Sequence, residues 1–218
     1  MNKLILVRHG LTVDNEHKSF SGFSDCDLSQ IGRAQAKGLC EYLKSCDVDK
    51  IYTSTLKRTV QTIEAYADYK GHEIDERDGF REINFGLFDG LNYQEIKEKY
   101  PKETEEMMVL SKDYKFPQGE SLDEMYQRNA KELDMVIEEN KGNDKNILIC
   151  SHMGTIRNIL SHLLTKNGDI HWNFRLQNAS VTVIDMSSGF PIIELMGFIP
   201  YSPVSYTHLR AHETVLDL

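Results

Sequence analysis

The sequence contains two apolar runs that each end in a histidine with a glycine close by. The first run, Leu4–Val7, leads directly into Arg8 and His9. The second run, Ile147–Cys150, leads through a serine to His152. Continuous apolar runs of this length are typical of strands that are buried on both faces of a parallel sheet. Ligands of such sheets bind outside the carboxyl ends of the strands, so the two imidazoles are expected to converge in one cleft if their strands are neighbours.

Arginine side chains are expected beside these histidines. Arg58 follows a short strand predicted at Lys50–Ser54 and falls in the first turn of the next predicted helix. Free backbone N–H groups at such a helix end favour an anion. Arg8 places a second guanidinium beside His9, and the planar fork of arginine matches phosphate oxygens. These residue types together predict a pocket for a dianion.

Two reactions remain open for such a pocket. In the first, a histidine attacks phosphorus, because an imidazole with a reference pKa of about 6.5 is largely neutral at physiological pH. The arginines and the other histidine would stabilise the phosphoryl oxygens, and a carboxylic acid would protonate the leaving alkoxide. In the second, His9, His152 and a carboxylate would hold a metal ion for a metal-dependent hydrolysis. The arginines would repel the metal, and the spacings H-E-x-x-H and H-x-H are absent, so the first reaction is favoured.

The elements that must position these residues alternate between strand and helix. Strands are predicted at Leu4–Val7, Lys50–Ser54, Glu73–Ile74, Ile147–Cys150, Ser180–Asp185 and Ile192–Met196, the last two as a hairpin. Helices are predicted from the Ser29 cap to about Ser45, from Thr55 to Gly71, at Asn92–Tyr100, from the capping box Ser121–Glu124 to about Asn140, and at Thr155–Leu164. The segments Gly10–Asp27 and Asp78–Gly90 are expected to be loops. This order predicts the α/β class, as a three-layer α/β/α sandwich with a mainly parallel sheet and helices on both faces.

In the helix after Ser29, the apolar face is expected at Ile31, Ala34, Leu39, Tyr42 and Leu43.

Residues 1–204 are expected to form a single domain, with an insertion or lid at about 91–118. The tail, residues 205–218, resembles a translated adaptor sequence and is left out of the fold argument. Its histidines, four residues apart, are not taken as a metal site.

The bulk composition narrows the possible partners. The chain has 218 residues and a formal net charge of −9, which argues against a general nucleic-acid or anionic-membrane binder. A small anionic substrate stays possible, because a pocket can be locally positive on an acidic protein. The four cysteines show no C-x-x-C spacing and indicate reduced thiols in a cytoplasmic protein. We see neither a signal-peptide layout at the start nor an apolar run long enough to span a bilayer.

Six stretches of the sequence resemble motifs of the histidine phosphatase superfamily, the phosphoglycerate-mutase-like group. In chain order they are RHGLTVDN, SDCDLSQIGRAQA, YTSTLKRTVQT, FREINFGLFDGL, QGESLDEMYQR and ICSHMGTIR. They occur in the family's order and cover the chain from about Lys3 to Val183. One such motif would be a weak signal, but six in order make the resemblance specific.

The resemblance implies a role for each matching residue. His9 would be the nucleophile that forms a phosphohistidine, and Glu82 would be the proton donor to the leaving group. Arg8, Arg58 and His152 would hold the phosphoryl group, with a further hydrogen bond from Asn15. Ser21 and Gly22 could also touch the phosphate, although turn formation explains these two residues equally well. Neither a metal nor a cofactor is implied, and the substrate would be a small phosphorylated metabolite.

The departures from the family pattern bear on the substrate. Leu11 stands where the family often has glutamate. A leucine at this position also occurs in phosphatases of the family. The single tryptophan, Trp172, and the short segment FREINFGLFDG favour a phosphatase over a mutase. Compact bacterial members that resemble this chain include α-ribazole-phosphate phosphatases and broad-specificity phosphomonoesterases, and the sequence does not separate the two.

Four functions therefore stay open. The favoured one is a metal-independent phosphomonoesterase that acts through a phosphohistidine. The others are a phosphoglycerate mutase, a non-catalytic binder of phosphorylated ligands on the same scaffold, and a metal-dependent hydrolase. The remaining histidines outside the tail, which have no partner pattern, are assigned no function: His17, His72, His162 and His171.

Overall fold

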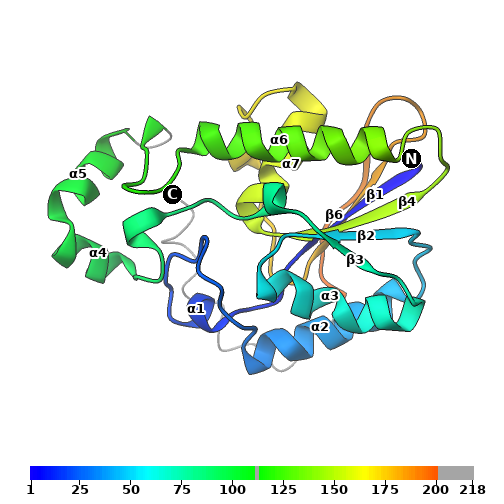
Figure 1. The fold of residues 1–218 in the computed structure, drawn as a ribbon, viewed down its shortest axis with the longest axis horizontal. Coiled ribbons are helices and arrows are strands. Elements are labelled where there is room, and N and C mark those ends of the chain that lie inside the picture. Colours follow the sequence, from blue (N-terminus) through cyan, green and yellow to red (C-terminus); the bar gives the residue numbers. More distant parts are fainter. Residues whose placement is uncertain (111–112, 201–218) are drawn as a thin grey trace.

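A computed structural model describes residues 1–110 and 113–200 of the chain (Figure 1). The strands are β1 (Lys3–Arg8), β2 (Lys50–Thr53), β3 (Ile74–Glu76), β4 (Asn146–Ser151), β5 (Val181–Asp185) and β6 (Ile192–Phe198). The α-helices are α1 (Val13–Glu16), α2 (Gln30–Leu43), α3 (Lys57–Lys70), α4 (Tyr93–Lys99), α5 (Pro101–Leu110), α6 (Leu122–Glu139) and α7 (Met153–Thr165). Short 3₁₀ turns occur at η1 (Asp78–Phe80), η2 (Gly86–Phe88) and η4 (His171–Asn173). The tail at 205–218 lies outside the described residues.

The described strands form one mixed sheet in the order β3-β2-β4-β1-β5-β6. The first four of these are parallel to one another, whereas β5 pairs antiparallel with both β1 and β6. This arrangement confirms the predicted α/β sheet and the closing hairpin. It also makes β1 and β4 direct neighbours, with Arg8 opposite Ser151 in the register.

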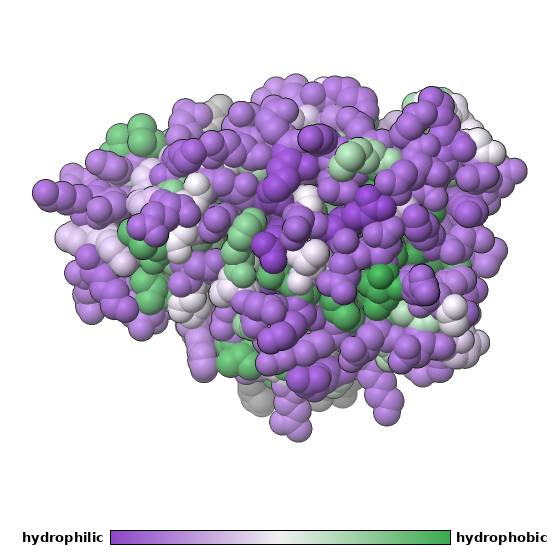
Figure 2. Space-filling view, in the orientation of Figure 1, coloured by the Kyte–Doolittle hydropathy of each residue, from purple (hydrophilic) through white to green (hydrophobic). Residues whose placement is uncertain are grey.

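Helices cover both faces of the sheet, so the predicted three-layer sandwich is confirmed (Figure 1). Alternate side chains of β1 point to opposite faces, as the pleat requires. Leu4 and Leu6 join the cluster that contains α6 and α7 residues such as Leu133. Ile5 and Val7 join the cluster on the other face, which contains residues of α2 and α3. In Figure 2 hydrophilic residues cover most of the visible surface, as the net charge would suggest.

The α2 face differs from the predicted one. Ser29 caps the helix as expected, but Ala34 is exposed, and Ile31 and Tyr42 are only half-buried. The buried positions are Gly32, Gln35, Ala36, Leu39, Cys40 and Leu43. The reason is that the start of α2 packs against backbone: a Cβ on Gly32 would lie 1.9 Å from the carbonyl oxygen of Leu11. A glycine and a glutamine are therefore buried at the start of α2, whereas the pattern of apolar residues pointed to Ile31 and Ala34 instead.

Three further boundaries differ from the predictions. The segment expected to be a loop at Gly10–Asp27 contains α1, a helix of a single turn. The third strand begins at Ile74, one residue later than predicted, and α3 begins at Lys57 instead of near Thr55. The region 91–118 contains α4 and α5, and these pack with neighbouring loops in a separate apolar cluster around Phe88, Ile96 and Met125.

Candidate active site

The two histidines that the sequence singles out meet at the carboxyl edge of the sheet. His9 directly follows β1, and His152 directly follows β4. Because these strands are adjacent and parallel, they deliver both side chains to the same place. The ring centroids lie 5.2 Å apart with an angle of 59° between the ring planes. Both imidazoles are buried, His9 at 5% exposure and His152 at 0%.

The His9 ring is held as one neutral tautomer. Its Nδ1 lies 2.7 Å from the carbonyl oxygen of Gly10. A carbonyl can only accept, so Nδ1 carries the proton and Nε2 keeps its lone pair. The turn at Gly10 is fixed in its place by a 2.9 Å hydrogen bond from its N–H to the Thr62 hydroxyl. Burial, followed by the charges of Arg58 and Arg8, holds the pKa of His9 well below its usual value of 6.5.

His152 is also neutral and has both ring nitrogens hydrogen-bonded. Its Nδ1 accepts a 3.1 Å hydrogen bond from Nε of Arg58, so Nε2 carries the proton and donates to the Ser54 hydroxyl at 2.8 Å. Burial is the largest cause that holds the pKa of His152 well below 6.5, and the nearby Arg58 and His9 act in the same direction. The hydroxyl of Ser54, which directly follows β2, thus fixes the orientation of the His152 ring.

Arg58 is fully buried at the start of α3. One terminal nitrogen donates to the carbonyl of Ser24 at 2.8 Å, and the other donates to the carbonyls of Gly22 at 2.7 Å and Ser21 at 3.3 Å. These carbonyls orient the guanidinium but carry no formal charge. Its positive charge therefore stays available to an anion in the site.

Arg8 and Asn15 come from the two elements that flank His9 along the chain, β1 and α1. Arg8 donates to the carbonyl of Leu176 at 2.5 Å. Asn15 takes part in a reciprocal capping box at the amino end of the one-turn helix α1, where its side chain accepts from the Thr12 N–H at 3.2 Å. Asn178 donates both to the His9 carbonyl at 3.1 Å and to the Asn15 side chain at 3.4 Å, which ties the α1 turn to the nucleophile candidate.

Glu82 reaches the same edge from a loop that follows β3. Its carboxylate accepts from the Gly154 N–H at 3.0 Å and from its neighbour Ile83 at 3.1 Å. Gly154 lies in the first turn of α7, two residues after His152, so the carboxylate sits beside the helix end that carries the histidine. A Cβ on Gly154 would lie 2.5 Å from Glu82 Oε1. Only glycine leaves room for the carboxylate in this position.

The loop that carries Glu82 is clamped by Arg128 of α6. Its guanidinium donates to the carbonyls of Gly79 at 3.1 Å, Arg81 at 3.0 Å and Glu82 at 3.1 Å. Glu120 accepts from the same guanidinium at 2.5 Å. A longer bond, at 3.4 Å, reaches the carbonyl of Asp78, so the ion pair orients a fork of donors onto four backbone carbonyls of the loop.

Ser21 and Gly22 line the Arg58 side of the site. Their carbonyls accept from Arg58, whereas the Gly22 N–H donates to Asp89 at 2.9 Å and the Ser21 hydroxyl lies 3.3 Å from Asp14. The phosphate contacts that the sequence suggested for these two residues stay a prediction.

Three residues with evident roles in this geometry were not singled out from the sequence. Arg128 stands in the quoted stretch QGESLDEMYQR, but nothing in its spacing marks it as a partner of the Glu82 loop. Ser54 lies at the carboxyl end of a predicted strand, and this position was a usable signal. Asn178 lies in a loop with no sequence signal, because its contacts are made with residues far away along the chain.

Within residues 1–110 and 113–200, no three His, Cys, Asp or Glu side chains gather in a way that could hold a metal ion. In the same residues, no helix has the length and apolar character needed to cross a membrane. What the site does offer is a neutral imidazole with a free lone pair, two guanidinium groups, a second imidazole and one carboxylate. This is a set of groups for nucleophilic attack on a dianion with electrostatic stabilisation of the charge.

Known proteins that are similar to this chain include phosphatases and a phosphoglycerate mutase, which act on phosphorylated compounds. Phosphoserine phosphatase 1 of Hydrogenobacter thermophilus is 34% identical over 85% of this chain and 87% of its own length. A 2,3-bisphosphoglycerate-dependent phosphoglycerate mutase of Cytophaga hutchinsonii is 28% identical over 99% of this chain and 97% of its own length. The alpha-ribazole phosphatase of Shigella flexneri shares the fold, with a TM-score of 0.82 at 22% identity over 90% of this chain and 96% of that chain. The family model of the histidine phosphatase superfamily (branch 1) matches residues 4–198, and the chain therefore belongs to that superfamily.

Proposed function

We propose that this histidine phosphatase is a metal-independent phosphomonoesterase that hydrolyses a small phosphorylated metabolite through a phosphohistidine on His9. The observation that carries the proposal is the state of the His9 ring. Its proton is held on Nδ1 by the Gly10 carbonyl, and its pKa is held well below 6.5 by burial. Nε2 is therefore a nucleophile at neutral pH without the help of a separate base.

In the first step, Nε2 of His9 attacks phosphorus, and the bond from phosphorus to the leaving oxygen breaks. Glu82 gives a proton to that oxygen, so the alcohol leaves neutral. Arg8 and Arg58 stabilise the charge on the transferring phosphoryl oxygens, and Asn15 adds a hydrogen bond. His152 contributes when its Nε2 proton, which donates to the Ser54 hydroxyl in the structure, turns to a phosphoryl oxygen instead. These roles agree with the resemblance of the motifs and with the positions of the side chains.

In the second step, water attacks the phosphohistidine. The Glu82 carboxylate takes a proton from the water, the N–P bond breaks, and His9 returns to its neutral form as inorganic phosphate leaves. Two contacts support this step: the Gly154 N–H donates to the carboxylate, and the Arg128 clamp holds the backbone of Glu82, so both keep the side chain at this edge of the sheet.

The test is the release of phosphate from p-nitrophenyl phosphate in the presence of EDTA. We expect activity in the wild type and none above background in His9→Ala. His17→Ala is the matched control, because His17 is exposed on the neighbouring turn, and it should keep full activity. Alkaline quenching followed by mass spectrometry should find one added phosphoryl group on His9. Activity that EDTA abolishes would instead support the metal-dependent hydrolase.

The substrate is the finer part of the proposal. The likeness to phosphoserine phosphatase 1 makes phosphoserine the first compound to test, and the fold shared with the alpha-ribazole phosphatase adds α-ribazole 5′-phosphate. The likeness to the Cytophaga mutase favours a second candidate, phosphoglycerate mutase activity. With 3-phosphoglycerate, the phosphatase should release inorganic phosphate. Conversion to 2-phosphoglycerate without phosphate release would identify a mutase.

A further inference from the structure

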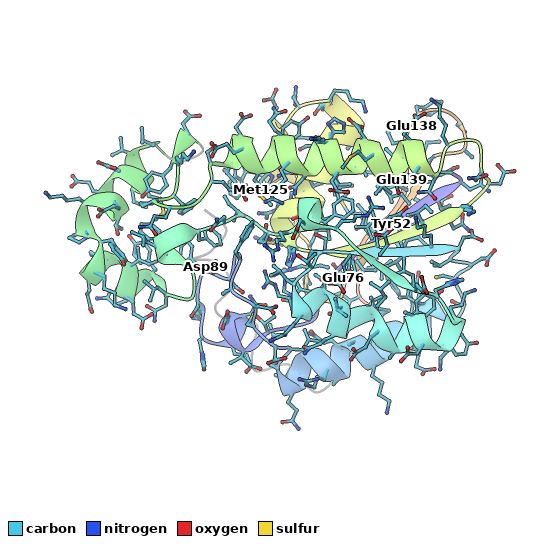
Figure 3. The ribbon with its side chains drawn as sticks, viewed as in Figure 1. Tyr52, Glu76, Asp89, Met125, Glu138 and Glu139 are labelled. Carbon is cyan, nitrogen blue, oxygen red and sulfur yellow. The ribbon has the colours of Figure 1, made fainter. Side chains whose placement is uncertain are left out.

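Residues 21–24 form a loop that lies against the carboxylate of Asp89. Asp89 Oδ1 accepts from the N–H of Gly22 at 2.9 Å. Oδ2 accepts from the N–H groups of Phe23 at 2.6 Å and Ser24 at 3.0 Å. Asp89 itself lies just after η2, on the segment that leads to α4 (Figure 3). One carboxylate therefore gathers three consecutive backbone donors.

The opposite edge of this loop faces Arg58. The guanidinium donates to the carbonyls of Ser21 and Gly22 through one terminal nitrogen and to the carbonyl of Ser24 through the other. Arg58 is fully buried. Its orientation is therefore set by these carbonyls and by its contact with His152.

Two peptide units of the loop connect the carboxylate to the guanidinium. A peptide unit is planar, and its N–H and C=O point in opposite directions. The unit between Ser21 and Gly22 donates to Asp89 and accepts from Arg58, and so does the unit between Gly22 and Phe23. Such chains polarise each other, so the loss of the carboxylate weakens the bonds to the guanidinium as well.

The loop has little freedom to adopt another shape. A Cβ on Gly22 would lie 2.1 Å from the carbonyl oxygen of Ile83, so the loop backbone packs directly on the segment next to Glu82. Its flanks are also paired, because Phe20 donates to the Leu91 carbonyl at 2.9 Å and accepts from the Gly90 N–H at 2.7 Å. The loop therefore transmits the position of Asp89 to Arg58.

We propose that Asp89 is a positioning residue for Arg58, acting through the peptide units of residues 21–24 to hold the guanidinium in its phosphoryl-binding orientation. The inference rests on the proposed function, in which Arg58 binds the phosphoryl group. Asp89 does not touch the substrate. It contributes by keeping the loop carbonyls aimed at the two terminal nitrogens of Arg58.

A double-mutant cycle tests this coupling. Asp89→Asn keeps the size of the side chain but leaves one acceptor oxygen for three backbone donors. We expect it to lower kcat/KM for p-nitrophenyl phosphate on the order of tenfold and to raise the inhibition constant of orthovanadate by a similar factor. This is less than the roughly 10²–10³-fold loss typical of removing a charge-stabilising donor. In an Arg58→Lys background, which cannot hold all three carbonyls, the same change should cost less than about twofold, because coupled residues are not additive.

The proposal is overturned if Asp89→Asn lowers kcat/KM by the same factor in both backgrounds, since Asp89 would then act independently of Arg58. Asp89→Glu retains the charge and should recover part of the lost activity; if Asp89→Asn does not fold, the cycle is run with Asp89→Glu and the same criterion. Asp49→Asn is the matched control. Asp49 accepts the Asn146 N–H at 2.8 Å at the amino end of the sheet, and its change should leave kcat/KM unaltered. A failure of the proposed function is distinguishable, because the wild type itself would then release no phosphate in the presence of EDTA, whereas a failure of this inference leaves the wild-type activity intact.

Discussion

The missing side chain at Gly154 makes room for the proposed proton donor. Glu82 accepts from the Gly154 N–H, and a Cβ at this position would lie 2.5 Å from one carboxylate oxygen. The same Cβ would lie 3.2 Å from Cε of Met125 on α6, so an alanine would be crowded on that side as well. The geometry of a single glycine thus controls where the carboxylate stands.

Gly154→Ala should therefore lower kcat for p-nitrophenyl phosphate by about 10²-fold, a loss within the usual contribution of general acid–base catalysis. KM should change little, because the phosphoryl-binding groups are untouched. Gly168→Ala is the control: its Cβ would meet only Tyr126 ring atoms at 3.6 Å, an ordinary contact. If Gly154→Ala keeps the kcat of the wild type, the position of the Glu82 carboxylate beside residue 154 is not needed for catalysis.

The two buried histidines predict an unusual pH profile. Burial and the charge of Arg58 hold the pKa values of His9 and His152 well below 6.5, so both rings stay neutral as the pH falls through that value. When the pH is lowered, kcat/KM corrected for the ionisation of the substrate should therefore not decrease with a midpoint near pH 6.5. Arg58→Gln removes a charge that lowers the His9 pKa, so any acidic limb should move to higher pH. A wild-type midpoint near 6.5 would contradict the neutral, buried nucleophile.

At the scale of elements, the Glu82 loop is held by side chains from three different elements. Ser151 of β4 donates to the Phe80 carbonyl at 2.8 Å, and Thr155 of α7 donates to the Arg81 carbonyl at 2.9 Å. Arg128 of α6 adds the fork described above. The loop between β3 and α4 thus has no regular structure beyond the 3₁₀ turns η1 and η2, yet its backbone is fixed by neighbouring elements.

Arg128→Lys should separate positioning from folding. A lysine ammonium is a compact charge without the fork, so it cannot bond four carbonyls and Glu120 together. We expect kcat to fall about tenfold with a smaller change in KM, and the far-ultraviolet circular dichroism to stay that of the wild type. Arg33→Lys on the exposed face of α2 serves as the control. If both variants retain the wild-type kcat, the clamp does not contribute to catalysis.

The sequence predicted the elements that have a strong hydrophobic period or a clear cap. The run Leu4–Val7 could be assigned because every residue of it is buried, and the Ser121 capping box forms as expected. The helix α1 was missed because it has one turn, no buried residue and a cap formed by Thr12 and Asn15 alone. The helix α5 was missed because it begins at Pro101, directly after the helix predicted at Asn92–Tyr100, and a proline at that place commonly marks a helix end, although it is also favoured in the first turn of a helix.

Prediction of the site followed the same physical limits. The convergence of His9 and His152 could be foreseen because parallel strands carry their carboxyl ends to one edge. The choice of Glu82 came from motif resemblance, since many carboxylates of the chain are equivalent by type. The partners Arg128 and Asp89 could not be foreseen, because their hydrogen bonds reach backbone atoms, which have the same chemistry at nearly every residue.

At the scale of the whole molecule, a buried chain of polar side chains connects three elements to the Glu82 loop. His171 of η4 donates from Nδ1 to Asn158 of α7 at 2.6 Å, and Asn158 donates to Asn129 of α6 at 2.8 Å. Asn129 in turn donates to the Gly79 carbonyl at 2.8 Å. All three side chains are buried, so the chain is stable only while each member keeps its partner.

Because of this row of buried polar side chains, we expect the fold to lose stability in acid before most carboxylates are protonated. Burial, followed by the charge of Arg157, lowers the pKa of His171 to about 4, whereas an unfolded histidine has a pKa of about 6.5. Between these values the unfolded chain binds a proton that the folded chain does not, so the free energy of unfolding decreases as the pH falls. For His171 alone the loss amounts to roughly 3 kcal/mol by pH 4, and the buried His9 and His152 act in the same direction.

Urea unfolding of the wild type, His171→Gln and His17→Gln between pH 7.5 and 5 measures this effect. Glutamine can still donate to Asn158 but does not titrate, so the decrease in the free energy of unfolding toward acid should become shallower in His171→Gln. His17 is exposed, and its change should leave the pH dependence of the wild type intact. An equal slope in all three proteins would mean that the acid sensitivity arises elsewhere. A shallower slope only in His171→Gln would locate it in the polar chain that spans α6, α7 and the loop of the proposed proton donor.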